Sequence, residues 1–196
     1  MVQNRDNRER TIKSEITFSG KGLHTGKVAN LRLLPASEGC GIIFIRKDIS
    51  DDAKLPAIAA NVSFTKRSTT LQCGDIQVIT SEHLLSALYA LKIDNVIIEI
   101  DNVEVPILDG SAAEYCKKID QVGVIEQKVD KDYYIVKQKI EVRDDTTGAA
   151  IVVLPDEDFS IDTMVAFDSP VLTNQFASLD RLSDFPKQIS ASRTFV

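Results

Sequence analysis

The chain contains an internal repeat, and only its first copy is complete. In the first copy, Ile12-Lys13 is followed 22 residues later by Leu34-Pro35. In the second copy, Val136-Lys137 is followed 18 residues later by Leu154-Pro155. Each copy begins as a strand, passes through a glycine-containing turn and closes with a strand that ends in Leu-Pro. Repetition of this kind predicts two similar structural units.

Helices follow the strands of the first copy. Ser81–Leu91 is predicted to be a helix because its leucines recur along one face, and Thr80 or Ser81 can cap its start. A second helix is predicted after Asp109-Gly110, with Ser111 and Glu114 as a capping box and Gly123 just past its end. Strands are predicted around these helices at residues 11–18, 28–34, 41–46, 69–71, 76–79 and 95–100.

The second copy has strands but reaches no helix. Strands are predicted at residues 133–142, 149–154 and 161–167, after a charged linker near 127–132. Ser81 opens the first helix 46 residues after Pro35, and the equivalent point after Pro155 falls beyond Val196. An uncovered strand layer exposes an apolar face. Either a partner or a second copy of the chain covers it, or the sequence is a piece of a longer protein, which is the interpretation we favour.

Composition narrows the class of protein. Hydrophobic residues make up 43% and charged residues 27% of the chain, as in an ordinary globular protein. The net charge of −6 argues against a general nucleic-acid binder. No apolar run approaches the roughly 18 residues of a membrane span, and residues 1–10 form a polar tail without the features of a secretory signal. The 3 cysteines include no Cys-x-x-Cys pair, which favours free thiols in a reducing cytoplasm.

The chain has 2 histidines, and both lie in segments that could carry chemistry. His83 follows Glu82 at the start of the first predicted helix. An imidazole can ligate zinc while a neighbouring carboxylate takes a proton from water, although both residues are also ordinary at a helix start. His24 lies in a glycine-rich loop that can bind a ligand or be a plain turn. Asp109-Gly110 is most simply a turn, and Phe167 a core residue of a strand.

Four segments in order, GKGLHTG, VITSEHLLSALYALKIDN, EVPILDGSA and SRTF, resemble the UDP-3-O-acyl-N-acetylglucosamine deacetylases of lipid A synthesis. The resemblance runs from about Thr11 to Val196. It implies an α+β fold of two similar domains, each a sheet with a helix pair. The first domain is expected at 11–128. An incomplete second domain, with strands but without its helices, is expected at 129–196.

The resemblance also implies roles for individual residues. His83 matches a zinc ligand and Glu82 the general base that activates water. Thr194 matches the hydroxyl that stabilises the oxyanion. Three further positions match residues at the substrate: His24, Phe167 and Phe195. The implied reaction is hydrolysis of the acetamide of a UDP-sugar that carries an acyl chain, with one Zn²⁺ per full-length chain.

The sequence departs from the family pattern after His83. The family supplies a second histidine and an aspartate as zinc ligands, and a further histidine as general acid, but no histidine follows His83 here. Catalytic zinc normally has three protein ligands. We therefore expect these 196 residues alone to be inactive and to hold zinc poorly. Some family members are fused to a 3-hydroxyacyl-carrier-protein dehydratase, and the parent protein can be bifunctional in the same way.

A second interpretation remains open. The chain could be a non-catalytic module that binds a nucleotide sugar or a partner on the same fold. The expected partners are otherwise the UDP-sugar substrate and, through the uncovered second sheet, another copy of the chain. Binding to nucleic acid and insertion into a membrane are not expected. The expected location is the cytoplasm.

Overall fold

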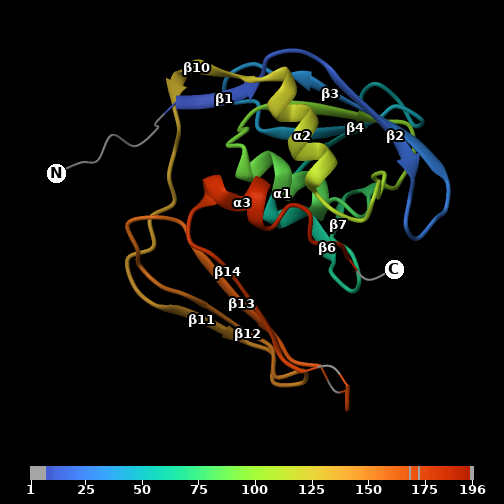
Figure 1. Cartoon of the computed structure of the whole chain (residues 1–196). Helices are drawn as coiled ribbons and strands as arrows, with labels where there is room; N and C mark the ends of the chain where they lie inside the picture. Colours follow the sequence, from blue (N-terminus) through green and yellow to red (C-terminus); the bar gives the residue numbers. More distant parts are fainter. Residues whose placement is uncertain (1–7, 168, 172, 195–196) are drawn as a thin grey trace. The chain divides into compact units, whose positions relative to one another are not determined.

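The computed structural model describes residues 8–167, 169–171 and 173–194 (Figure 1). Its contacts divide the chain into two compact units. The first is Met1–Asp130 with Phe185–Val196, and the second is Lys131–Asp184. The mixture of sheets and helices confirms the predicted α+β class. The proposed division into two family domains stays a prediction.

A five-stranded sheet forms the centre of the first unit, in the order β2-β3-β9-β4-β5. Its strands are β2 (Ile16–Lys21), β3 (Val28–Pro35), β4 (Ile42–Arg46), β5 (Lys54–Pro56) and β9 (Val96–Ile100). Strand β4 runs parallel to β9, and the other neighbouring pairs are antiparallel. Along β3, Ala29, Leu31 and Leu33 are buried while their neighbours are more exposed, so one face of the sheet is directed to the core.

Helices α1 (Glu82–Ala90) and α2 (Ala113–Val122) pack against each other (Figure 1). Both contribute to the core beside the large sheet. Helix α1 buries Leu84, Ala87 and Leu88, and α2 buries Tyr115, Cys116 and Ile119. The four-residue helix α3 (Phe185–Gln188) contacts both helices, and Phe185 packs against the core.

Two smaller sheets complete the first unit. Strands β6 (Val62–Phe64), β7 (Thr70–Cys73) and β8 (Ile76–Val78) form an antiparallel meander, with the predicted Gly74-Asp75 turn between β7 and β8. Ala59–Asn61 forms a 3₁₀ turn ahead of β6. Strand β1 (Arg8–Ile12) pairs antiparallel with β10 (Val124–Asp130), which brings distant parts of the sequence together.

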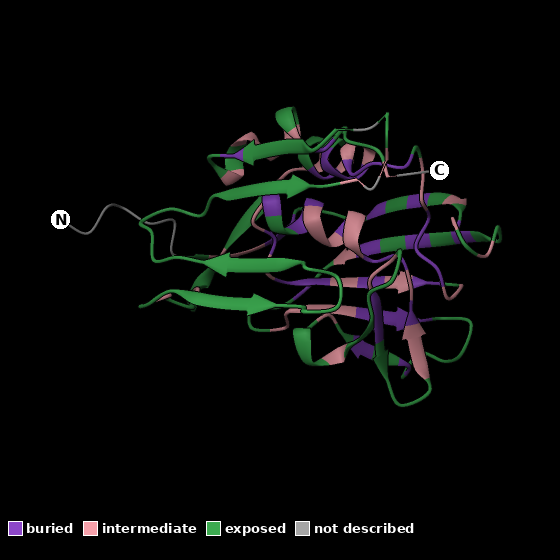
Figure 2. Ribbon diagram, turned by 90° about the horizontal axis from the view of Figure 1, so that it is seen from below, coloured by how far each residue is buried: buried purple, intermediate pink, exposed green. Residues whose placement is uncertain are grey.

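Buried apolar residues concentrate in the sheet and helices of the first unit. Figure 2 shows the buried segments of the ribbon in purple. The fully buried residues form one continuous cluster that includes Phe44, Leu88, Ile98, Tyr115 and Ile119. Burial of each large apolar side chain stabilises the fold by roughly 1.5–3 kcal/mol. The cluster therefore holds α1 and α2 in the core of the first unit.

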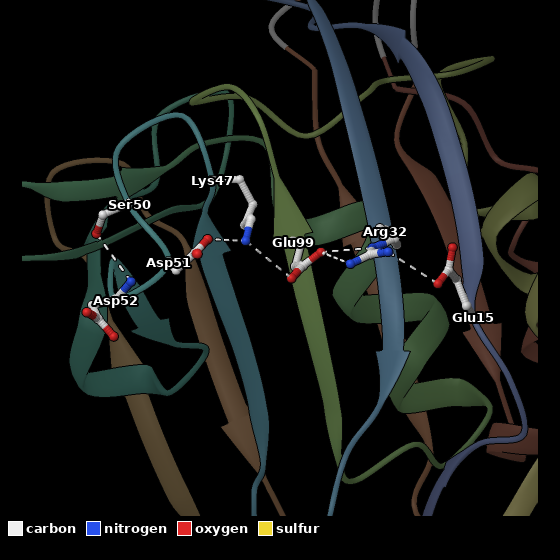
Figure 3. A network of polar contacts seen from close by, with 7 residues as sticks. All are labelled: Glu15, Arg32, Lys47, Ser50, Asp51, Asp52 and Glu99. Carbon is white, nitrogen blue, oxygen red and sulfur yellow. Dashed lines mark hydrogen bonds and ion pairs between the residues drawn. The ribbon is translucent and has the colours of Figure 1, made fainter.

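A chain of ion pairs crosses three strands of the large sheet. Glu99 on β9 binds Arg32 of β3 at 2.7 Å and lies 3.7 Å from Lys47, just after β4 (Figure 3). Arg32 also reaches Glu15, and Lys47 pairs with Asp51. Glu99 raises the pKa of Arg32 through a hydrogen bond and its charge. These polar contacts identify the solvated side of the sheet.

The second unit consists of two hairpins. Strand β11 (Ile140–Arg143) pairs with β12 (Ala150–Val153), and β13 (Ile161–Val165) pairs with β14 (Gln175–Leu179). Every residue of β11, β12 and β13 is exposed. A 3₁₀ turn, Leu182–Asp184, closes the unit. None of the described helices is long and apolar enough to cross a bilayer.

Several predicted boundaries were wrong. The strand expected at 11–18 is interrupted, since β1 ends at Ile12 and β2 begins at Ile16; between them Lys13 N–H donates to Gly123 O. The tail expected at 1–10 includes Arg8–Arg10 of β1. The expected linker near 127–132 largely belongs to β10, and the strand expected at 133–142 is only β11.

The predicted helix caps were also wrong. Ser81 Oγ donates to Thr69 O at 3.0 Å and caps no α1 amide. The Ser111–Glu114 capping box does not form, because Ser111 N–H donates to Asp109 Oδ1 at 3.1 Å and Ser111 Oγ accepts from Ala113 N–H at 3.2 Å; α2 begins only at Ala113. Gly123 does end α2, with a φ of 85°.

Candidate functional site

Glu82 and His83 lie at the first two positions of α1, and both are half-buried. The Glu82 Oε2 atom accepts a hydrogen bond from Thr69 N–H at 2.9 Å. Ser81 binds the Thr69 carbonyl through both its N–H and its hydroxyl. The β6–β7 loop therefore fixes the Glu82 carboxylate from one side. A carboxylate held at one oxygen can still accept a proton at the other.

His24 lies in the loop Gly22–Gly26, called the His24 loop below, and its side chain is exposed. The loop is held by Glu104, which is 1% exposed. Glu104 Oε1 accepts from His24 N–H at 2.9 Å, and Oε2 accepts from the N–H and hydroxyl of Thr25, each at 2.7 Å. The hydroxyl of Thr80 donates to Oε1 at 2.9 Å.

These bonds determine the charge of Glu104. Burial by itself raises the pKa of a carboxyl group, but the donors from His24, Thr25 and Thr80 outweigh it. The pKa of Glu104 therefore lies below its ordinary value, and the group is ionised at neutral pH. No cation pairs with it among the residues that the structure describes.

A groove of about 510 Å³ separates the His24 loop from the β6–β7 loop. Its lining includes His24, Lys66, Arg67, Thr70 and Ile79. Lys66 and Arg67 are exposed, and within the described parts of the chain neither has an acidic partner. The groove thus combines an imidazole with two unneutralised cations, although the whole chain is acidic. It lies beside Thr69, the residue that holds Glu82.

Thr194 is anchored at a different point of the first unit. Its N–H donates to Gly110 O at 2.8 Å, and Ala112 N–H donates to Ser190 O at 2.9 Å. Asp109 also lies 3.7 Å from the Arg193 guanidinium. The hydrogen bond from Ser111 is the main cause that lowers the pKa of Asp109, with Arg193 a smaller one. The Asp109-Gly110 turn therefore serves as an anchor for residues 190–194.

Four of the six predicted site residues lie in the described part of the first unit. His24, Glu82 and His83 belong to neighbouring segments of the first unit, and Thr194 is held at the turn before α2. Phe167 belongs to the second unit and is half-buried. It follows β13, so its predicted place within a strand was wrong. Phe195 lies outside the described residues.

The described residues do not by themselves fit a zinc site. Across residues 8–167, 169–171 and 173–194, no group of three or more His, Cys, Asp or Glu side chains could hold a metal ion. Three protein ligands are the usual number for catalytic zinc. His83 with Glu82 supplies one imidazole and one neighbouring carboxylate.

Four residues of this region were not predicted from the sequence: Lys66, Arg67, Thr80 and Glu104. Lys66 and Arg67 occur in a short polar loop with no motif. Glu104 had a usable signal, since it is the one charged residue in the apolar run from Val103 to Leu108. A buried acid in such a run needs several donors, which indicates a packed polar network.

A carboxylate–imidazole pair beside a cationic groove, held on an α+β fold, would suit an enzyme of the hydrolase class. Comparison with known families agrees with this class. The model of the family described as UDP-3-O-acyl N-acetylglycosamine deacetylase matches residues 9–196. The chain belongs to this family.

Individual relatives match almost the whole length of this chain. The chain is 46% identical over 189 residues to a bifunctional enzyme LpxC/FabZ of Porphyromonas gingivalis and 45% identical to that of Bacteroides thetaiotaomicron. It is 42% identical over 193 residues to the UDP-3-O-acyl-N-acetylglucosamine deacetylase of Saccharophagus degradans. Each match covers 96% of this chain. The chain spans 41% of the bifunctional relatives and 62% of the deacetylase.

Proposed function

We propose that this chain forms part of the catalytic site of a zinc-dependent deacetylase that removes acetate from UDP-3-O-acyl-N-acetylglucosamine in lipid A synthesis, in the cytoplasm. Family membership supports the reaction. The observation that carries the proposal for this chain is the Glu82 carboxylate, held by Thr69 N–H at 2.9 Å, next to His83. The groove beside it supports a substrate with negative charge.

In this proposal Glu82 takes a proton from the attacking water. The oxygen of that water forms a bond to the acetamide carbon, and the C–N bond then breaks to give acetate and a free amine. Thr194 donates a hydrogen bond to the oxyanion of the tetrahedral intermediate. The leaving nitrogen receives its proton from a general acid that the described residues do not provide.

Lys66 and Arg67 are proposed to bind the diphosphate of the UDP group. Arg offers paired N–H donors that match phosphate oxygens, and Lys adds a mobile positive charge. His24 borders the same groove and is proposed to contact the substrate. Phe167 and Phe195 remain proposed substrate contacts from the family resemblance alone.

His83 is proposed as one zinc ligand, which requires further ligands in addition to those described. We therefore propose that the 196 residues alone do not turn over substrate. The direct measurement is the zinc content after dialysis together with acetate release. One tightly held zinc per chain, with deacetylation, would contradict this part of the proposal.

The reaction itself is tested with the complete product of the source gene. We expect Glu82→Gln to lower kcat by about 10²–10⁴-fold, the usual contribution of a general base, with little change in KM. Glu114→Gln, in the first turn of α2, is the matched control and should keep wild-type kcat. If both variants retain full activity, Glu82 is not the base.

A binding module without catalysis is the second candidate, because the cationic groove offers contacts for a nucleotide sugar that need no metal ion. Both candidates use the same groove. Acetate release by the complete gene product separates them. A binding module retains uridine diphosphate but releases no acetate.

A further inference from the structure

Glu104 joins the His24 loop to the segment that carries Glu82 and His83. The N–H of His24 and the hydroxyl of Thr80 donate to the same oxygen atom, Oε1. The His24 loop and the residue that precedes Ser81-Glu82-His83 are therefore separated by no more than two hydrogen-bond lengths. The main chain on each side of Glu104 pairs with Ile79, since Ile79 N–H donates to Val103 O and Val105 N–H donates to Ile79 O.

Thr80 is in a strained conformation. Its φ is 58°, in the left-handed region that β-branched residues avoid. It is 1% exposed, so its hydroxyl depends on a protein partner, and that partner is Glu104. Strain of this kind persists only when the surrounding structure imposes it, and it concentrates at functional sites. Here it sets the direction in which the chain enters α1.

The His24 loop packs directly on the same carboxylate. A Cβ atom at Gly22 would collide with the Glu104 side chain, so the loop approaches this closely only with glycine there. Three of the four donors to Glu104 come from the loop. A neutral side chain of similar size could not accept all four bonds, because an amide nitrogen would face two of the donors.

We propose that Glu104 is a positioning residue, which sets the His24 loop and the Thr80–His83 segment in a fixed relation across the groove. The inference rests on the proposed function only in taking His24, Glu82 and His83 as site residues. In this proposal Glu104 contacts no reacting atom. The two histidines move apart or become mobile when the carboxylate is lost, even while the core stays folded.

The test uses the imidazole NMR signals of the 196-residue chain, which has only these 2 histidines. In Glu104→Gln we expect the ring signals of both His24 and His83 to shift or split. Thr80→Val removes the hydroxyl but keeps the shape, and should change the His83 signal in the same direction. Thr80→Ser restores the hydroxyl and should return the signal to its wild-type position.

A matched control separates positioning from general loss of stability. Ile119→Val shortens a core side chain of α2 outside the Glu104 network. It should lower stability while both histidine signals keep their positions. If Glu104→Gln does not fold, the Thr80→Val and Thr80→Ser pair decides the question. Unchanged histidine signals in a folded Glu104→Gln or in Thr80→Val would overturn the proposal.

The binding of uridine diphosphate is a second measurement, which tests the positioning role of Glu104 separately from the proposed function. Uridine diphosphate is titrated into the wild-type chain and into Glu104→Gln, and we expect several-fold weaker binding by the variant. If the wild-type chain does not bind uridine diphosphate but its histidine signals respond to Glu104→Gln, the substrate assignment of the groove is wrong and the positioning role stands. Equal binding together with unmoved histidine signals contradicts the positioning role.

Discussion

The buried thiol of Cys116 behaves differently from the exposed thiol of Cys73. Burial is the main cause that raises the pKa of Cys116 from 9.0 to about 11, and the nearby Asp120 adds to it. Because the thiolate is the reactive form, we expect iodoacetamide at pH 8 to label Cys73 quickly and Cys116 only after unfolding. Mass spectrometry of the labelled peptides measures both rates.

The same shift predicts a loss of stability at alkaline pH. The Cys116 thiol ionises at a lower pH in the unfolded chain than in the folded one. The stabilisation that the folded chain gains from the neutral, buried thiol is therefore complete below pH 9 and is lost as the pH rises toward about 11. Cys116→Ala should remove this part of the dependence of the unfolding free energy on pH. Rapid labelling of Cys116 in the folded chain at pH 8 would show that the thiol is not buried as described.

At the scale of single residues, the sequence predicted roles for Glu82, His83 and His24 through the family resemblance, and these roles stay predictions. It could not identify Thr80 and Glu104 as a pair. Their interaction depends on the packing of a loop 80 residues away from Glu104, and no local pattern records that contact. Long-range polar networks of this kind are determined by tertiary structure.

At the scale of elements, α2 depends on its buried face. Ile119 is fully buried and packs within the central cluster. We expect Ile119→Ala to lower the free energy of unfolding by about 2–5 kcal/mol, through lost burial and the cavity that remains. Urea denaturation of the reduced chain, followed by circular dichroism, measures the change.

Gln121→Ala is the control for this prediction, since Gln121 is an exposed position of the same helix. Its effect should stay within about 0.5 kcal/mol of wild type. Equal losses in both variants would mean that the burial of Ile119 contributes no more to stability than the exposed position of Gln121.

Helices and the hairpin at Gly74-Asp75 followed from local signals, whereas helix caps and strand ends did not. Leucine spacing is sufficient to predict α1, because a buried stripe has a fixed period. The capping box at Ser111 failed because the Asp109 carboxylate accepts the Ser111 N–H that Glu114 would otherwise bind. Strand β10 was missed because its partner, β1, lies more than 100 residues away in sequence. Pairing at that distance leaves no local pattern.

At the scale of the whole molecule, the first unit has a buried core and the second presents apolar side chains to solvent. Met164 and Phe176 are register partners on β13 and β14 and are 67% and 69% exposed. Val142 and Ile151 form a similar exposed pair on β11 and β12. Contiguous apolar surface of this kind favours association. We therefore expect the 196-residue chain to self-associate as its concentration rises.

The measurement is sedimentation velocity over a concentration series with Met164→Lys/Phe176→Glu, which places an opposite-charge pair on that surface. This variant should remain monomeric at concentrations where the wild type associates. Thr163→Lys/Ala177→Glu adds the same charges at the next register pair, on the opposite face of the hairpin, because successive strand residues alternate in direction. If association depends on the apolar face, only the first variant abolishes it. If both do, charged side chains on either face of the hairpin prevent association and the Met164–Phe176 face is not its specific cause. If the wild type stays monomeric throughout, the exposed hairpins do not drive assembly.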